Sequence, residues 1–285
     1  MKKILTCTAA ALLLSTPAFA QSVVPKQGFY LGAGGGVSSS SFSDQAITAT
    51  GTSDTYRTST GAFMSSGTAT GPAVDRSLDT KTSITPSLQA GYFRQFEGSN
   101  WLVGGKLTYN YLNNKSTDSR FLIPQYGSFG ATSFTGNAVV QSFSVNVRQQ
   151  VALMPYVGYT FDRSYIYLGA GPTLSQIESK INGVIGFADI NGNRTDISGT
   201  PQNFSNSDWV WGGAVQIGAT YFLDSSWFVD VNYTLGATQN KTANYNSTFR
   251  NVNANTGLTY TGTLVGSSEG STMTQMFGIT INRKF

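Results

Sequence analysis

The sequence lacks histidine altogether, and its one cysteine, Cys7, lies near the N-terminus. The rest of the chain therefore cannot form an internal disulfide, and a metal site built on cysteine or histidine is excluded. Charged residues are also scarce, at 11% of the chain against about 25% in an average soluble protein. No run of basic residues marks a surface for nucleic acid. We therefore expect no metal, no cofactor and no nucleic-acid partner.

The first twenty residues have the features of an export signal. Lys2 and Lys3 precede an apolar stretch over residues 4–14, and the small residues Ala18 and Ala20 follow it. This order is typical of a cleaved signal peptide, with the cut after Ala20. The apolar stretch is shorter than the ~20 residues that a membrane-spanning helix requires. We therefore expect a signal peptide over residues 1–20 and an exported domain over residues 21–285.

The dominant pattern beyond residue 20 is alternation of apolar and polar residues. It is clearest in residues 101–112, 143–161 and 227–238, where large apolar side chains occupy nearly every second position. Period two is typical of a β-strand with two unlike faces. Five further segments fit the same template: residues 28–37, 84–96, 165–176, 209–223 and 273–285. The total is eight strands, each close to the ~9–11 residues that cross a bilayer when tilted.

The connections between these strands alternate in length. Three are short, and four are long and polar: residues 97–100, 162–164 and 224–226 against residues 38–83, 113–142, 177–208 and 239–272. Short periplasmic turns and long external loops are typical of bacterial outer-membrane barrels. We therefore predict an all-β fold for residues 21–285. It is a single antiparallel, eight-stranded, up-and-down transmembrane β-barrel with four long external loops and three short periplasmic turns.

The contents of the two strand faces predict which face lies inside. One carries Trp, Val, Leu, Ile and Tyr, and the other carries Gly, Ser, Thr, Asn and Gln with isolated charges at Lys106, Arg148 and Asp230. A membrane barrel turns its apolar face to lipid and its polar face to the lumen. We therefore expect the three charged residues to project inward. Aromatic residues beside the short turns predict an interfacial belt, which includes Phe96, Trp101, Phe161, Tyr165 and Trp227.

Several segments resemble one known family. The Gly-rich residues 28–36 and 165–172 are similar to the first and fifth strands of OmpA-type barrels, and residues 85–92 are similar to the second. The C-terminus resembles the signature that the outer-membrane assembly machinery recognises, through Phe277, Ile279, Ile281 and Phe285. The family includes opacity-like proteins and porin-family surface antigens, so the resemblance implies the outer membrane of a Gram-negative bacterium. The peptidoglycan-binding domain of OmpA has no counterpart here, so cell-wall anchoring is not implied.

The absence of histidine also bears on catalysis. Enzymes built on small outer-membrane barrels, among them the omptin proteases, resemble this predicted fold but use a histidine in their catalytic sets. General base chemistry near neutral pH otherwise needs a carboxylate or a lysine with a shifted pKa. No nucleophile–base spacing stands out among the many Ser and Thr residues. We therefore predict that the chain is not an enzyme.

A structural or surface-interaction role and a small channel are the two remaining hypotheses. Side chains just fill the interior of a barrel of about eight strands. Lys106, Arg148 and Asp230 would then form either a static polar network or a gate whose charge pair breaks to pass ions. The external loops, such as residues 121–126 with their apolar side chains, either touch a host or surface ligand or pack over the barrel mouth. We favour the first role (envelope integrity, adhesion or surface antigen), with outer-membrane lipids and lipopolysaccharide as surrounding partners.

Overall fold

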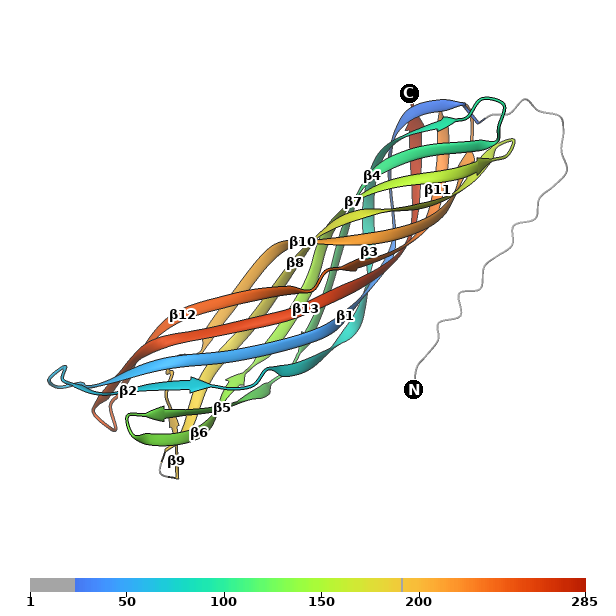
Figure 1. Cartoon of the computed structure of the whole chain (residues 1–285). Coiled ribbons are helices and arrows are strands. Elements are labelled where there is room, and N and C mark those ends of the chain that lie inside the picture. The colour runs from blue at the N-terminus through green and yellow to red at the C-terminus, as the bar shows by residue number, and fades with distance from the viewer. Residues whose placement is uncertain (1–23, 191) are drawn as a thin grey trace.

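The computed structural model describes residues 24–190 and 192–285, which form one antiparallel sheet of thirteen strands (Figure 1). In these residues no helix is long and apolar enough to cross a membrane. The strands, in chain order, are β1 (Gln27–Arg57), β2 (Phe63–Thr70), β3 (Val74–Gln95), β4 (Trp101–Asp118), β5 (Phe121–Phe129), β6 (Thr132–Val140), β7 (Ser142–Thr160), β8 (Ser164–Ile190), β9 (Asn193–Asp196), β10 (Gln202–Phe222), β11 (Trp227–Thr238), β12 (Lys241–Asn253) and β13 (Leu258–Lys284).

The sheet curls round on itself, because its first and last long strands pair with each other. β1 runs antiparallel to β13 from Tyr30, opposite Lys284, to Arg57, opposite Leu258. On its other edge β1 pairs with β3. The three short turns lie with the C-terminus at one end of the molecule (Figure 1). We call the part of the sheet next to these turns the terminal section.

The opposite end of the molecule is a second part of the sheet, which we call the extension. It consists of β2, β5, β6, β9 and β12 together with the parts of β1, β4, β7, β8, β10 and β13 that lie away from the short turns. Figure 1 shows β2, β5, β6 and β9 grouped at the end away from the C-terminus. β1 alone has 31 residues, about three times the ~9–11 that cross a bilayer. The long strands are therefore longer than one crossing of a bilayer requires.

The extension corrects the prediction of four long loops. Residues 38–83, 113–142, 177–208 and 239–272 are mostly β-strand, so the described residues hold thirteen strands where the sequence predicted eight. The three short turns are where the sequence placed them. The error has a physical cause, because these segments are rich in Thr and Ser with few large apolar residues. Thr is a good strand former, but a sequence without large apolar residues gives only a weak period-two signal.

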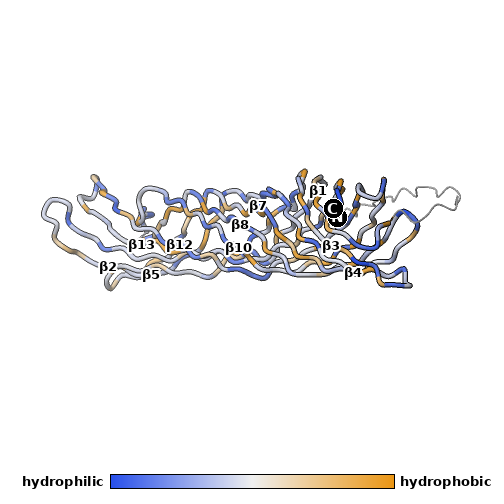
Figure 2. The backbone as a smooth tube through the Cα atoms, turned by 90° about the horizontal axis from the view of Figure 1, so that it is seen from above, coloured by the Kyte–Doolittle hydropathy of each residue, from blue (hydrophilic) through white to orange (hydrophobic). Residues whose placement is uncertain are grey.

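The two parts of the sheet have opposite polarity. In the terminal section, large apolar side chains such as Leu31, Ile84 and Leu168 are exposed on the outer face, while polar residues such as Ser38 and Thr85 are buried inside. In the extension the buried interior is an apolar core that includes Phe42, Ile47, Leu112, Phe121, Ile123, Val140, Phe143, Val145, Val147, Ile181 and Phe204. Figure 2 shows strongly apolar residues spaced more densely along the strands toward the C-terminal end. The outer face suits lipid at one end and water at the other.

β-Bulges produce this change of polarity within single strands. In β1 the register shifts between Ser43 and Ala46, where Asp44 has a φ of 54°. Ser40 faces inward before the bulge and Ile47 after it, so the inward face changes from even to odd residues. In β7 the shift lies between Val147 and Gln149. A bulge adds one residue to one strand of a pair. In β1 the odd-numbered residues therefore face outward before the bulge and inward after it.

Candidate functional site

A buried polar network in the terminal section is the candidate functional site. It centres on Lys106 of β4 and Asp230 of β11, each only 2% exposed. Lys106 and Asp230 point inward because alternate residues of β4 and β11 are exposed to the outside, including Trp101 and Tyr233. The network thus depends on strands that come from distant parts of the chain and meet only when the sheet has curled.

Each charge in the network has a direct partner. Lys106 Nζ lies 2.9 Å from Asp230 Oδ2 and donates to the hydroxyl of Tyr167 at 2.7 Å. That hydroxyl donates in turn to Asp230 Oδ1 at 2.8 Å. The ammonium group also lies 4.6 Å from the centre of the Tyr167 ring. A buried ion pair of this kind is costly to break, because separating it leaves an unpaired charge in a low-dielectric interior.

A second layer of amide and hydroxyl groups joins the ion pair to β13. Gln89 Nε2 lies 3.3 Å from Asp230 Oδ2, 2.8 Å from Thr280 Oγ1 and 2.6 Å from Asn282 Oδ1. Asn282 Nδ2 donates back to Thr280 Oγ1 at 3.1 Å. All four of these residues are buried. The interior at this level is therefore filled by side chains that hydrogen-bond one another across β3, β11 and β13.

An aromatic cluster fills the interior between this network and the short turns. It consists of the buried residues Val24, Tyr30, Phe93, Leu102, Tyr156, Tyr165, Tyr167, Phe222 and Phe228. Ring centres lie 4.9 Å apart for Phe222 and Phe228, and 5.1 Å apart for Tyr30 and Phe228. Tyr167 belongs to both groups, since its ring packs against Tyr156 and its hydroxyl reaches Asp230. The terminal end of the interior is thus packed with rings.

Arg148 does not join Lys106 and Asp230, and the prediction that it projects inward is wrong. Its side chain is exposed on the outer face of β7. The cause is the register shift between Val147 and Gln149, which gives β7 one residue more than β8 at this point. An alternation count that starts at the short-turn end of β7 therefore assigns Arg148 to the wrong face.

Four of the five predicted belt residues lie on the outer surface near the short turns. Phe96, Trp101, Phe161 and Trp227 are each about half exposed. The prediction for Tyr165 is wrong, because that side chain is 2% exposed and packs inside against Phe93. In its stead Ile166, the next residue of β8, faces outward.

The predicted C-terminal signature forms one exposed row. Phe277, Ile279, Ile281 and Phe285 are all exposed on the outer face of the terminal section. Whether the assembly machinery reads this row stays a prediction. Ala18 and Ala20, the predicted signal cleavage residues, lie outside the described residues, as does most of the predicted signal peptide.

The candidate site also contains residues that the sequence did not single out. Gln89, Tyr167 and Asn282 complete the network, although each sits in a segment that the alternation correctly identified as a strand. The alternation in the sequence indicates that these residues point inward. It does not show which of the many inward polar residues contact one another, because that depends on how the strands are shifted along each other. No cluster of three or more potential metal-ligating residues occurs within residues 24–190 and 192–285.

A curled antiparallel sheet with lipid-compatible side chains outside and a packed polar interior defines the outer-membrane β-barrel class. The model of one family, the outer membrane protein beta-barrel domain, matches residues 6–261. This match extends over most of the chain, and the protein belongs to that family. The family indicates the bacterial outer membrane as the location.

Solved structures of outer-membrane proteins are similar to this chain at low sequence identity. The outer membrane protein OprG from Pseudomonas aeruginosa is 14% identical with a TM-score of 0.38, covering 92% of this chain and 98% of its own. Neisserial surface protein A is 12% identical with a TM-score of 0.32, covering 86% and 99%. The outer membrane protease OmpT from Escherichia coli is 12% identical with a TM-score of 0.25, covering 90% and 97%. A search of curated protein sequences gives no significant match.

Proposed function

We propose that eight of the thirteen strands form the membrane-spanning barrel. β1, β3, β4, β7, β8, β10, β11 and β13 each pair with the next in this order, and β13 pairs with β1. A closed circuit of ladders leaves no open strand edge in lipid, which supports this assignment. The three short turns then face the periplasm, and the extension stands outside the cell.

We further propose that the protein is a non-enzymatic surface protein whose barrel anchors the extension. The observation that carries this proposal is the filled interior: the aromatic cluster and the Lys106–Asp230 network occupy the section that crosses the membrane. The role outside is one of interaction, as an adhesin, a surface antigen or a stabiliser of the envelope. Its expected partners are outer-membrane lipids and lipopolysaccharide around the barrel, the assembly machinery during insertion, and a host or surface ligand at the extension.

The orientation can be tested by labelling single cysteines in intact cells. The only cysteine lies at position 7, so a cysteine introduced elsewhere is unique once the signal is removed. Ser59→Cys, between β1 and β2, is expected to react with a membrane-impermeant maleimide in whole cells. Glu97→Cys, in the first short turn, is expected to react only after the outer membrane is permeabilised. Labelling of Glu97→Cys alone in intact cells would contradict the proposed orientation.

A small channel is the second candidate, and the charged pair in the interior is the observation that favours it. In that case Lys106 and Asp230 would separate to let ions pass. Planar-bilayer recording of the folded protein distinguishes the two functions. We expect no stable conductance from the wild type, and a conductance whose ion selectivity changes in Lys106→Met would establish the channel instead. An enzyme is the third candidate and is disfavoured, because the chain has no histidine to act as a base.

A further inference from the structure

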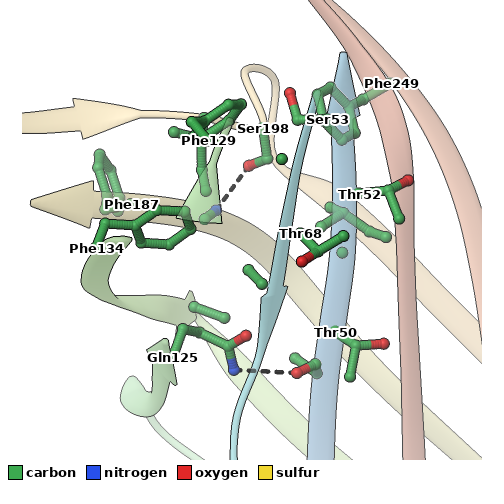
Figure 3. A pocket seen from close by; sticks show the side chains of 18 residues that line it. Thr50, Thr52, Ser53, Thr68, Gln125, Phe129, Phe134, Phe187, Ser198 and Phe249 are labelled. Carbon is green, nitrogen blue, oxygen red and sulfur yellow. Dashed lines mark hydrogen bonds between the residues drawn. The ribbon is translucent and has the colours of Figure 1, made fainter. Parts of the chain in front are cut away.

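A cavity inside the extension has no assigned role. It lies near the outer tip, enclosed by β1, β2, β5, β6, β8, β12 and β13, and Figure 3 shows the side chains that surround it. It contains about 460 Å³ of space not filled by protein atoms, part of which is open to solvent. It is separate from the ion pair of the terminal section. Any role for this cavity is therefore independent of whether the barrel conducts.

The lining of the cavity is apolar and uncharged. Four phenylalanine rings, Phe129, Phe134, Phe187 and Phe249, contribute to it together with Ile197 and Leu264. The remaining lining residues are small or neutral, and none carries a formal charge. Aromatic walls with a few polar groups are typical of small-molecule sites.

Small residues on the inner face leave the cavity open. Ala49, Gly51, Ala69, Ala138 and Gly186 all line it, whereas the adjoining core of the extension uses Ile, Val and Phe at inward positions. At Gly186 a β-carbon would lie 3.5 Å from its nearest neighbours, Ile197 and Ser198, which is ordinary contact. Position 186 therefore has room for a side chain larger than that of glycine. A second apolar void shares Ala49 and Leu264 with this one and leads toward the core.

One polar group in the lining lacks a partner. Ser53, 5% exposed, has a buried hydroxyl with no hydrogen bond to any described residue. The amide nitrogen of Gln125, which also lines the cavity, donates to Ala49 O at 3.0 Å. A buried hydroxyl without a partner costs free energy that a bound group able to hydrogen-bond would recover. The site therefore favours a ligand with one polar group over a pure hydrocarbon.

We propose that this cavity binds a small, uncharged aromatic molecule carrying one hydroxyl-type group. The ring packs among Phe129, Phe134 and Phe249, and the polar group hydrogen-bonds Ser53. Charged molecules are disfavoured, because no side chain of opposite charge lines the cavity. The ligand enters from the outer tip, since the core of the extension closes the other end.

The test uses 4-fluorophenol as the probe and fluorine NMR line broadening as the readout, with the full chain in lipid nanodiscs. Empty nanodiscs measure partition of the probe into lipid. We expect saturable line broadening with the wild type. The broadening should be lost in Ala138→Leu, because the leucine side chain fills the cavity. It should be retained in Thr135→Leu, which adds the same side chain on the outer face of β6. Ser53→Ala should weaken binding about three- to tenfold. Equal broadening in all variants and in empty nanodiscs would overturn the proposal.

Crystals soaked in 4-bromophenol provide a second readout. The bromine anomalous signal is expected between Phe134 and Phe249, and a signal only elsewhere would also overturn the proposal. A heat-dependent gel shift checks that each variant is folded. Should Ala138→Leu fail this check, the smaller substitution Ala49→Val on the opposite wall replaces it.

Discussion

Lys106 Nζ and Asp230 Oδ2 lie 2.9 Å apart in the interior of the terminal section, and Tyr167 hydrogen-bonds both side chains. β4 and β11, which carry the two charges, share no ladder. The ion pair therefore connects parts of the sheet that backbone hydrogen bonds do not join directly.

Removing one member of this pair should destabilise the folded barrel. Asp230→Ala leaves the Lys106 ammonium buried without its counter-charge, and we expect a loss of about 3–5 kcal/mol in the free energy of unfolding. Urea unfolding in lipid vesicles measures this loss. The double substitution Lys106→Met with Asp230→Leu removes both charges and should recover most of it. A wild-type unfolding curve for Asp230→Ala would show that the pair contributes nothing.

Arg148→Ala should behave differently from Lys106→Ala. Arg148 is exposed on the outer face of β7, so its removal is expected to change the free energy of unfolding by no more than about 0.5 kcal/mol. Single-channel recording should also show no change. A loss of stability like that of Lys106→Ala would mean that Arg148 faces the lumen after all.

The bulge in β1 offers a test of how the sheet changes polarity. Inserting one further residue after Asp44 shifts the following residues by one position against β13 and should turn Ile47 and Ala49 outward, away from the core of the extension. We expect rapid trypsin cleavage at Arg57, which the wild type should resist. Asp44→Gly keeps the residue count and suits the positive φ at this position, so it should stay resistant.

The turn between β10 and β11 predicts a specific response to acid. The Asp224 carboxylate accepts backbone hydrogen bonds from Ser226 at 2.7 Å and Trp227 at 2.8 Å, and these hold its pKa below the ordinary value. A lowered folded-state pKa contributes stability above the unfolded value of about 3.9, and this is lost as pH falls through the folded value. Asp224→Asn should therefore lose part of the acid dependence seen in urea midpoints between pH 7 and pH 3. Asp162→Asn, in the neighbouring short turn, controls for the loss of one surface charge.

The strands of the terminal section were predicted well from the sequence, because large apolar and polar residues alternate clearly there. Lys106 and Asp230 lie on the polar faces of β4 and β11, and the alternation along these strands correctly predicted that both point inward. It failed at Arg148 because a bulge leaves no mark in an alternating sequence. It failed at Tyr165 because aromatic rings occur both in interfacial belts and in packed interiors. The exposed aliphatic neighbours Ile166 and Leu168 carried the correct signal.

The extension was missed for a different reason. Its inward residues include Ala49 and Ser53, which are too small to produce a clear hydrophobic period. Which strands pair in the extension also depends on contacts between segments that are far apart in the chain, as in the pairing of β2 with β5. Neither the cavity nor its aromatic wall could be located without that pairing.

The continuity of β1 and β13 from the terminal section to the outer tip has a mechanical consequence. At about 3.3 Å per residue, the 31 residues of β1 extend for roughly 100 Å. Tension applied at the tip along the strands loads the hydrogen bonds between β1 and β13 in shear, so that many must rupture together instead of unzipping in turn. We therefore expect the molecule to resist extension and to transmit a force applied at its tip directly to the strands of the barrel.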